Sequence, residues 1–126
     1  MNPRKRFIPL LAGLMITLGL VSGCASKPTE TTMGPDGVQV VKVVVQGGYQ
    51  PNHIVAKADK PMRIEFYRDE DPGAHSCVED LAIPEEKVKI HLPARESQIV
   101  EIKPHKAGEM TFQCGMEMVK GKITFQ

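Results

Sequence analysis

Hydrophobic and polar residues alternate along most of the chain that follows residue 38. Val41, Val43 and Val45 flank Lys42 and Val44, and the same period of two recurs in later segments. Such alternation predicts half-buried β-strands, whose successive side chains point to opposite faces. The segments that we expect to be strands are 38–46, 54–58, 62–67, 88–92, 97–103, 110–114 and 122–126. Because Pro and Gly separate them and no helical stripe persists, we predict an all-β protein, an antiparallel β-sandwich of about seven strands.

The first 23 residues follow a different pattern. Three basic residues near the N-terminus precede an apolar run over residues 7–21, and small residues follow it. This order is typical of a secretory signal peptide, and the run is shorter than the roughly 20 residues of a membrane-spanning helix. Residues 20–24 resemble the bacterial lipobox, which implies cleavage before Cys24 and acylation of its thiol.

Three regions follow from this interpretation. Residues 1–23 are expected to be a lipoprotein signal peptide, and residues 24–37, rich in Thr, Pro, Gly and Ser, a lipidated cysteine with a flexible tether. Residues 38–126 are expected to form the folded domain. Because the basic end of a leader stays in the cytoplasm, we expect the domain to be lipid-anchored at the cell membrane on its extracytoplasmic face.

Composition excludes several functional classes. The chain has 126 residues, and its 16 Lys and Arg against 15 Asp and Glu give a formal net charge of +1, so no basic surface for nucleic acid is predicted. We also expect no enzyme, because the sequence has no Gly-rich phosphate loop, no Cys-x-x-Cys pair and no recognisable Ser, His and Asp motif.

Sulfur-containing side chains are concentrated near the C-terminus. If Met110, Phe112 and Cys114 face inward on one strand, Cys114 ends that strand at the rim of the core. Met116 and Met118 follow at a spacing of two, so an extended loop would project both thioethers to one side. Thiolates and thioethers are soft donors that prefer Cu(I), whereas hard cations require oxygen ligands.

Two motifs carry a resemblance to a known family. Residues 72–84, around Cys77, resemble the strand and loop that bring the N-terminal metal ligand in plastocyanin-like cupredoxins, and residues 112–114 with 121–125 resemble their cysteine loop and final strand. The resemblance implies a cupredoxin-like Greek-key β-sandwich. A blue-copper site needs two imidazoles beside the thiolate, but no His follows Cys114.

Among cupredoxins, the sulfur set is similar to the CupA-type copper chaperone, a membrane-anchored protein. This resemblance implies that Cys77 and Cys114 bridge one or two Cu(I) ions and that Met116 and Met118 hold the more labile ion. It further implies a protein that buffers or transfers Cu(I) in copper resistance or homeostasis. Its partner would be a copper-exporting P-type ATPase or, given the leader, another extracytoplasmic copper protein.

Two alternatives stay open at the sequence level. His75 shares strand parity with Cys77, so it could supply an imidazole to a copper site of an electron-transfer cupredoxin. A disulfide between Cys77 and Cys114 would instead fit a β-sandwich interaction module, because disulfides persist outside the cytoplasm.

Overall fold

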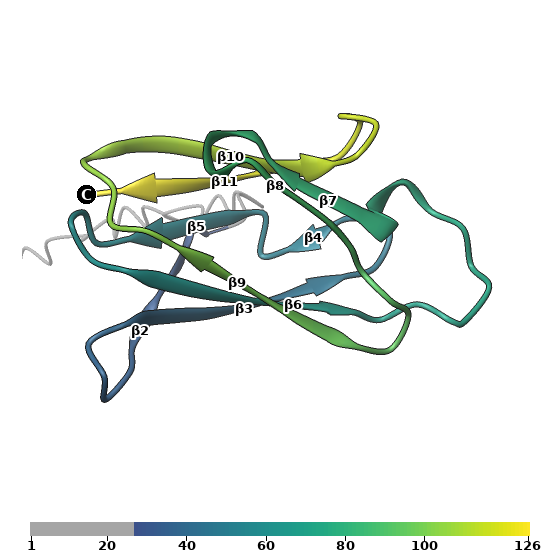
Figure 1. Ribbon diagram of the computed structural model, residues 1–126, viewed down its shortest axis with the longest axis horizontal. Coiled ribbons are helices and arrows are strands. Elements are labelled where there is room, and N and C mark those ends of the chain that lie inside the picture. Colours follow the sequence, from purple (N-terminus) through teal and green to yellow (C-terminus); the bar gives the residue numbers. More distant parts are fainter. Residues whose placement is uncertain (1–26) are drawn as a thin grey trace, which may run out of the picture.

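Two β-sheets packed face to face form the protein in a computed structural model, which describes residues 27–126 (Figure 1). The predicted signal peptide and Cys24 lie outside these residues. The strands and two short 3-10 helices are β1 Thr29–Glu30, β2 Thr32–Met33, β3 Gln39–Val45, β4 Tyr49–Gln50, β5 His53–Ala56, β6 Met62–Arg68, η1 Cys77–Glu79, β7 Asp80–Ile83, η2 Pro84–Glu86, β8 Val88–His91, β9 Ser97–Ile102, β10 Gly108–Cys114 and β11 Lys120–Phe125. Within the described range, no helix is long and apolar enough to cross a bilayer.

The all-β class is confirmed, but the sheets are mixed rather than antiparallel. One sheet has the order β1-β5-β11-β10-β7-β8, and the other has β2-β3-β6-β9 with β4 beside β3. The pairs β3–β6, β5–β11 and β1–β5 are parallel. The β3–β6 pair is parallel because the chain leaves β3, crosses through β5 in the opposite sheet and returns as β6 in the same direction as β3. Alternation alone does not distinguish the two directions, since a strand with one buried face shows it in both.

The core lies between the two sheets and follows the alternation in the sequence. Strand β6 buries Met62, Ile64 and Phe66, while the residues between them are half-buried. The rings of Tyr49, Phe66 and Phe112 meet edge to face, with centroids 5.0–6.4 Å apart. Alternation therefore identified the inward faces correctly.

The segment 24–37 contributes to both sheets within its described part. Strand β1 pairs with β5, and β2 pairs with β3. Between them, the Thr31 hydroxyl donates to the buried Gln39 side chain at 2.8 Å. Within the described residues, the sandwich thus includes Thr29–Met33 as well as the segment from residue 38, because these short strands pair with one strand of each sheet.

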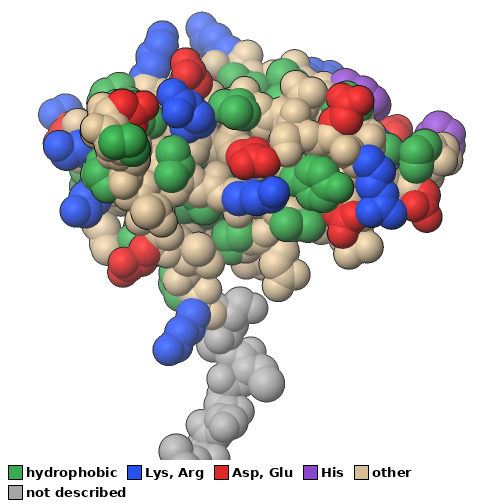
Figure 2. Space-filling model, turned by 90° about the horizontal axis from the view of Figure 1, so that it is seen from below, with side chains coloured by type: hydrophobic (Ala, Val, Ile, Leu, Met, Phe, Trp, Pro, Cys, Tyr) green, Lys and Arg blue, Asp and Glu red, His purple; other side chains and the backbone are tan. Residues whose placement is uncertain are grey.

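The outer face of the second sheet carries opposite charges in pairs. Lys42 lies 3.4 Å from Glu65, and Arg63 lies 3.5 Å from Glu101. Figure 2, seen from below, shows basic and acidic side chains interspersed across the visible face. Exposed pairs of this kind contribute little to stability, and they leave this face without a field of one sign.

Candidate metal centre

Cys114 ends β10 with its side chain in the core. Met110, Phe112 and Cys114 are all buried on one face of the strand, as the alternation predicted. The Cys114 N–H donates to the Val119 carbonyl at 2.9 Å, and the Val119 N–H donates to the Cys114 Sγ at 3.4 Å. The turn that follows the strand therefore folds back over the sulfur and aims a donor at it.

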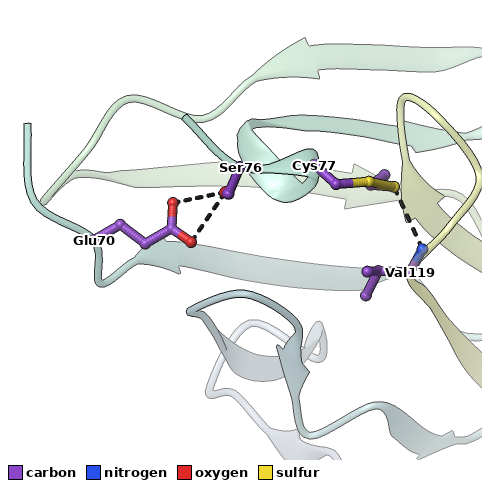
Figure 3. Close-up of a disulfide and its surroundings, with 5 residues drawn as sticks. Glu70, Ser76, Cys77 and Val119 are labelled. Atoms are coloured by element: carbon purple, nitrogen blue, oxygen red, sulfur yellow. Dashed lines mark hydrogen bonds between the residues drawn. A yellow bond between two sulfur atoms is a disulfide. The ribbon is translucent and has the colours of Figure 1, made fainter. Parts of the chain in front are cut away.

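Cys77 opens the short helix η1 and meets Cys114 from the neighbouring segment. Their Cα atoms are 5.8 Å apart, and their sulfurs form a disulfide bond (Figure 3). The pairing of β7 with β10 produces this proximity, because Leu81 is opposite Cys114 and the Gly115 N–H donates to the Asp80 carbonyl at 2.9 Å. The two cysteines singled out in the sequence are thus brought together at one site.

Met116 and Met118 lie in the turn between β10 and β11, and both are exposed, at 72% and 75% of their accessible surface. The turn is not the extended loop that their spacing suggested. Glu117 takes a left-handed conformation with φ of 59°, and its N–H donates to the Cys114 carbonyl at 2.9 Å. Burial in the core is excluded for both thioethers, which are accessible at the same end of β10 as the cysteine pair.

The imidazole of His75 is exposed to solvent. Its side chain is 88% exposed, and its Nδ1 is 3.8 Å from a Glu79 carboxylate oxygen. No group of three or more His, Cys, Asp and Glu side chains is arranged to hold a metal ion anywhere in residues 27–126.

Sequence reasoning missed a polar network next to Cys77. Ser76 donates to Glu70, and Glu70 accepts from Arg68, whose side chain is only 4% exposed. The sequence did contain one indication of this network. Arg68 lies on the same inward-facing side of the strand as Met62, Ile64 and Phe66, and a charged residue at such a position needs buried partners.

Burial by itself would raise the pKa of Glu70. Hydrogen bonds from Arg68, the Gly47 N–H and Ser76 outweigh that effect, so the pKa of Glu70 lies below its ordinary value. Glu70 therefore carries its charge at neutral pH.

Comparisons with known proteins agree with this architecture. The family model described as cupredoxin-like domain matches residues 13–125. The metal binding domain of the Streptococcus pneumoniae D39 Cu(I) exporting P-type ATPase CopA, solved with Cu(I), is 25% identical with a TM-score of 0.73, covering 81% of this chain and 98% of that domain. A copper binding protein solved by NMR in its apo form is 36% identical with a TM-score of 0.72, covering 79% of this chain and 98% of that one.

A more distant likeness concerns the fold alone. Auracyanin B is 13% identical with a TM-score of 0.51, and the match covers 81% of this chain and 92% of that protein. A search of the curated proteins finds no match to the chain.

Proposed function

The chain belongs to the cupredoxin-like domain family, and from this premise we propose that it binds Cu(I) through the sulfurs of Cys77 and Cys114. The observation that carries the proposal is the convergence of these two sulfurs at the end of β10, beside a turn with two exposed methionines. Two similar structures are a metal binding domain solved with Cu(I) and a copper binding protein.

The donor set favours Cu(I) over Cu(II). Two thiolates on one Cu(I) leave a charge of −1, and a second Cu(I) makes the cluster neutral. Neutrality matters because Cys114 is fully buried, and an uncompensated charge there would lose its hydration. We therefore propose one tightly held Cu(I) between the cysteines and a second, more labile ion that Met116 and Met118 help to hold.

Exposed thioethers next to a buried thiolate are suited to passing Cu(I) to a partner protein. An incoming sulfur from a partner can replace one outgoing methionine at a time, so the metal passes on without becoming a free ion. Buffering or transfer of Cu(I), without chemical turnover, is the activity we propose. The partner is a copper-exporting P-type ATPase or another extracytoplasmic copper protein.

Copper binding requires the reduced cysteine pair. A thiol reductant must supply two electrons and two protons to the disulfide, giving two thiols while its own thiols become a disulfide, and each cysteine thiol then loses a proton when its sulfur binds Cu(I). The disulfide also favours a second candidate function, a β-sandwich interaction module in which the bond is purely structural. The two candidates differ in what the reduced protein does with copper.

An anaerobic titration with Cu(I) against a competing chelator distinguishes them. We expect the reduced protein to bind about two Cu(I) per chain and the oxidised protein to lose the tight step. Cys77→Ser or Cys114→Ser should abolish the tight step, whereas Met116→Leu or Met118→Leu should weaken only the second. If the reduced protein cannot compete for even one Cu(I), copper binding is refuted and the structural disulfide remains.

We further propose that a lipid on Cys24 holds the domain at the extracytoplasmic face of the membrane, after removal of residues 1–23. Cys24→Ser should prevent incorporation of labelled palmitate and release the protein from the membrane fraction. A Cys24→Ser protein that still sediments with membranes, together with no palmitate on the wild type, would contradict the anchor.

A further inference from the structure

The chain that leads to Cys77 has no regular structure of its own. Between the end of β6 at Arg68 and the start of η1 at Cys77, residues 69–76 form neither strand nor helix. The chain after Cys77 is held firmly, since Leu81 pairs with Cys114 and the Leu92 N–H donates to the Glu79 carbonyl at 2.6 Å. Cys77 therefore lies at the junction between an irregular loop and a firmly held segment, and contacts on both sides contribute to its position.

Glu70 fixes the end of this loop by hydrogen bonds. One of its carboxylate oxygens accepts from the Ser76 hydroxyl at 2.8 Å and the other at 3.0 Å (Figure 3). The same carboxylate accepts from the Gly47 N–H at 2.9 Å and from the Arg68 Nε at 2.7 Å. Glu70 thus ties the residue that directly precedes Cys77 to two separate segments of the second sheet.

Arg68 fixes Glu70 in turn. Its guanidinium donates to the Ala74 carbonyl at 2.7 Å and to the Leu92 carbonyl at 3.0 Å, and it lies 3.6 Å from a Glu79 carboxylate oxygen. With side chains only 4% and 9% exposed, Arg68 and Glu70 are a nearly buried ion pair. Such pairs are weak sources of stability, because desolvation offsets much of their attraction, but they can define one geometry among several.

We propose that Glu70 is a positioning residue for the copper pair, which fixes Cys77 opposite Cys114 by binding the Ser76 hydroxyl. The inference rests on the proposed function, since the geometry it maintains is that of the Cu(I) ligands. Without this contact, the loop would keep the Arg68–Ala74 bond and the pairs of Arg95 with Asp69 and Asp71. Ser76, which directly precedes Cys77, would lose its own restraint, so Cys77 would sample more positions and the effective concentration of its sulfur at Cys114 would fall.

The test compares two serines that each donate to a glutamate. Ser76→Ala removes the contact to Glu70, and Ser97→Ala removes the matched 2.7 Å contact to Glu65 on the outer sheet face. Full-length protein in detergent is measured for Cu(I) affinity by chelator competition and for the equilibrium between its disulfide and a glutathione buffer. Urea unfolding of each variant separates a change at the site from a general loss of stability.

We expect Ser76→Ala to weaken the tight Cu(I) step about tenfold and to shift the glutathione equilibrium toward the dithiol by a similar factor, as for loss of one hydrogen bond to a charged group. Glu70→Gln should act in the same direction, Ser76→Thr should restore both values, and Ser97→Ala should change neither.

One result would count against the inference, and it is separable from failure of the proposed function. Ser76→Ala that lowers only the free energy of unfolding, with wild-type copper affinity and glutathione equilibrium, would show a merely structural contact. If the wild type itself binds no Cu(I), the proposed function fails, and the glutathione equilibrium of Ser76→Ala still decides whether Glu70 positions Cys77.

Discussion

The sulfur of Cys114 is fully buried in the apolar core, and yet a backbone N–H points at it. The Val119 N–H lies 3.4 Å from it. Burial disfavours the charged thiolate, whereas a donor aimed at the sulfur favours it. In the proposed Cu(I) complex, this donor would offset part of the cost of keeping a thiolate at the rim of the core.

Tyr49, in contrast, has a buried hydroxyl with no hydrogen-bond partner among the described residues. Its ring packs against Phe66 and Phe112. Burial raises the pKa of Tyr49 above its ordinary value, since the phenolate would lose its hydration. A buried group of this kind costs free energy and contributes only its ring to the core.

We therefore predict that Tyr49→Phe raises the free energy of unfolding by about 1 kcal/mol at neutral pH. The raised pKa adds a second destabilisation, which begins above the pKa of the unfolded phenol, about 10. The advantage of Tyr49→Phe over the wild type should accordingly grow above that pH. Urea unfolding at pH 7 and pH 11 measures both effects, with Tyr67→Phe, on the outer sheet face, as the control. A loss of stability in Tyr49→Phe would mean that the hydroxyl has a partner.

At the scale of single elements, the sequence was most informative about which side of a strand faces inward. The burial of Met62, Ile64 and Phe66 in β6 and of Phe112 and Cys114 in β10 follows the predicted parity. Strand direction was not encoded in this pattern, because it depends on where the connections cross. The parallel pairing of β3 with β6 was therefore missed.

The alternation of apolar and polar residues also did not predict the shortest elements or the conformations of the turns. Strand β7, Asp80–Ile83, was not among the strands predicted from the alternation, although it is as long as β5 and β8 and its burial alternates. It is defined by its partners β8 and β10. The turn at Met116–Met118 depends on the left-handed backbone of Glu117, a residue type that gives no sign of it in the sequence. Spacing identified the sulfur residues but could not predict how their side chains are presented.

The sequence predicted that Cys77 and Cys114 belong to one site, but it did not predict the contacts that surround them. Cys77 and Cys114 were singled out from their residue type and motif, and the fold joins them. The contact between Glu70 and Ser76 was missed because it depends on a loop conformation that is specified by Arg68 through tertiary contacts. Local sequence patterns carry little information about such contacts.

Across the whole molecule, the candidate metal centre and the first ordered strands lie at different ends of the sandwich. The connection between β10 and β11 is at one end in Figure 1, whereas β2 and the C-terminus are at the other. Only four residues separate Cys24 from Thr29, and the five residue steps span at most about 18 Å when fully extended. If Cys24 carries a lipid, the domain is held close to the membrane, with less reach than a tether ending at residue 37 would give.

This arrangement predicts separate effects of the N-terminal strands on stability and on copper binding. A chain that starts at residue 38 lacks the pairing of β1 with β5 and of β2 with β3, and it leaves the buried Gln39 without its Thr31 donor. Since each lost hydrogen bond contributes about 0.5–1.5 kcal/mol, we expect it to be less stable than a chain that starts at residue 25 by roughly 2–4 kcal/mol in urea unfolding. The affinity of the folded protein for Cu(I) should be the same in both, because the cysteine pair is held by β7, β10 and the Glu70 contacts. Equal stability of the two chains would mean that residues 29–33 add nothing to the fold, and a parallel loss of copper affinity would mean that the two ends are coupled.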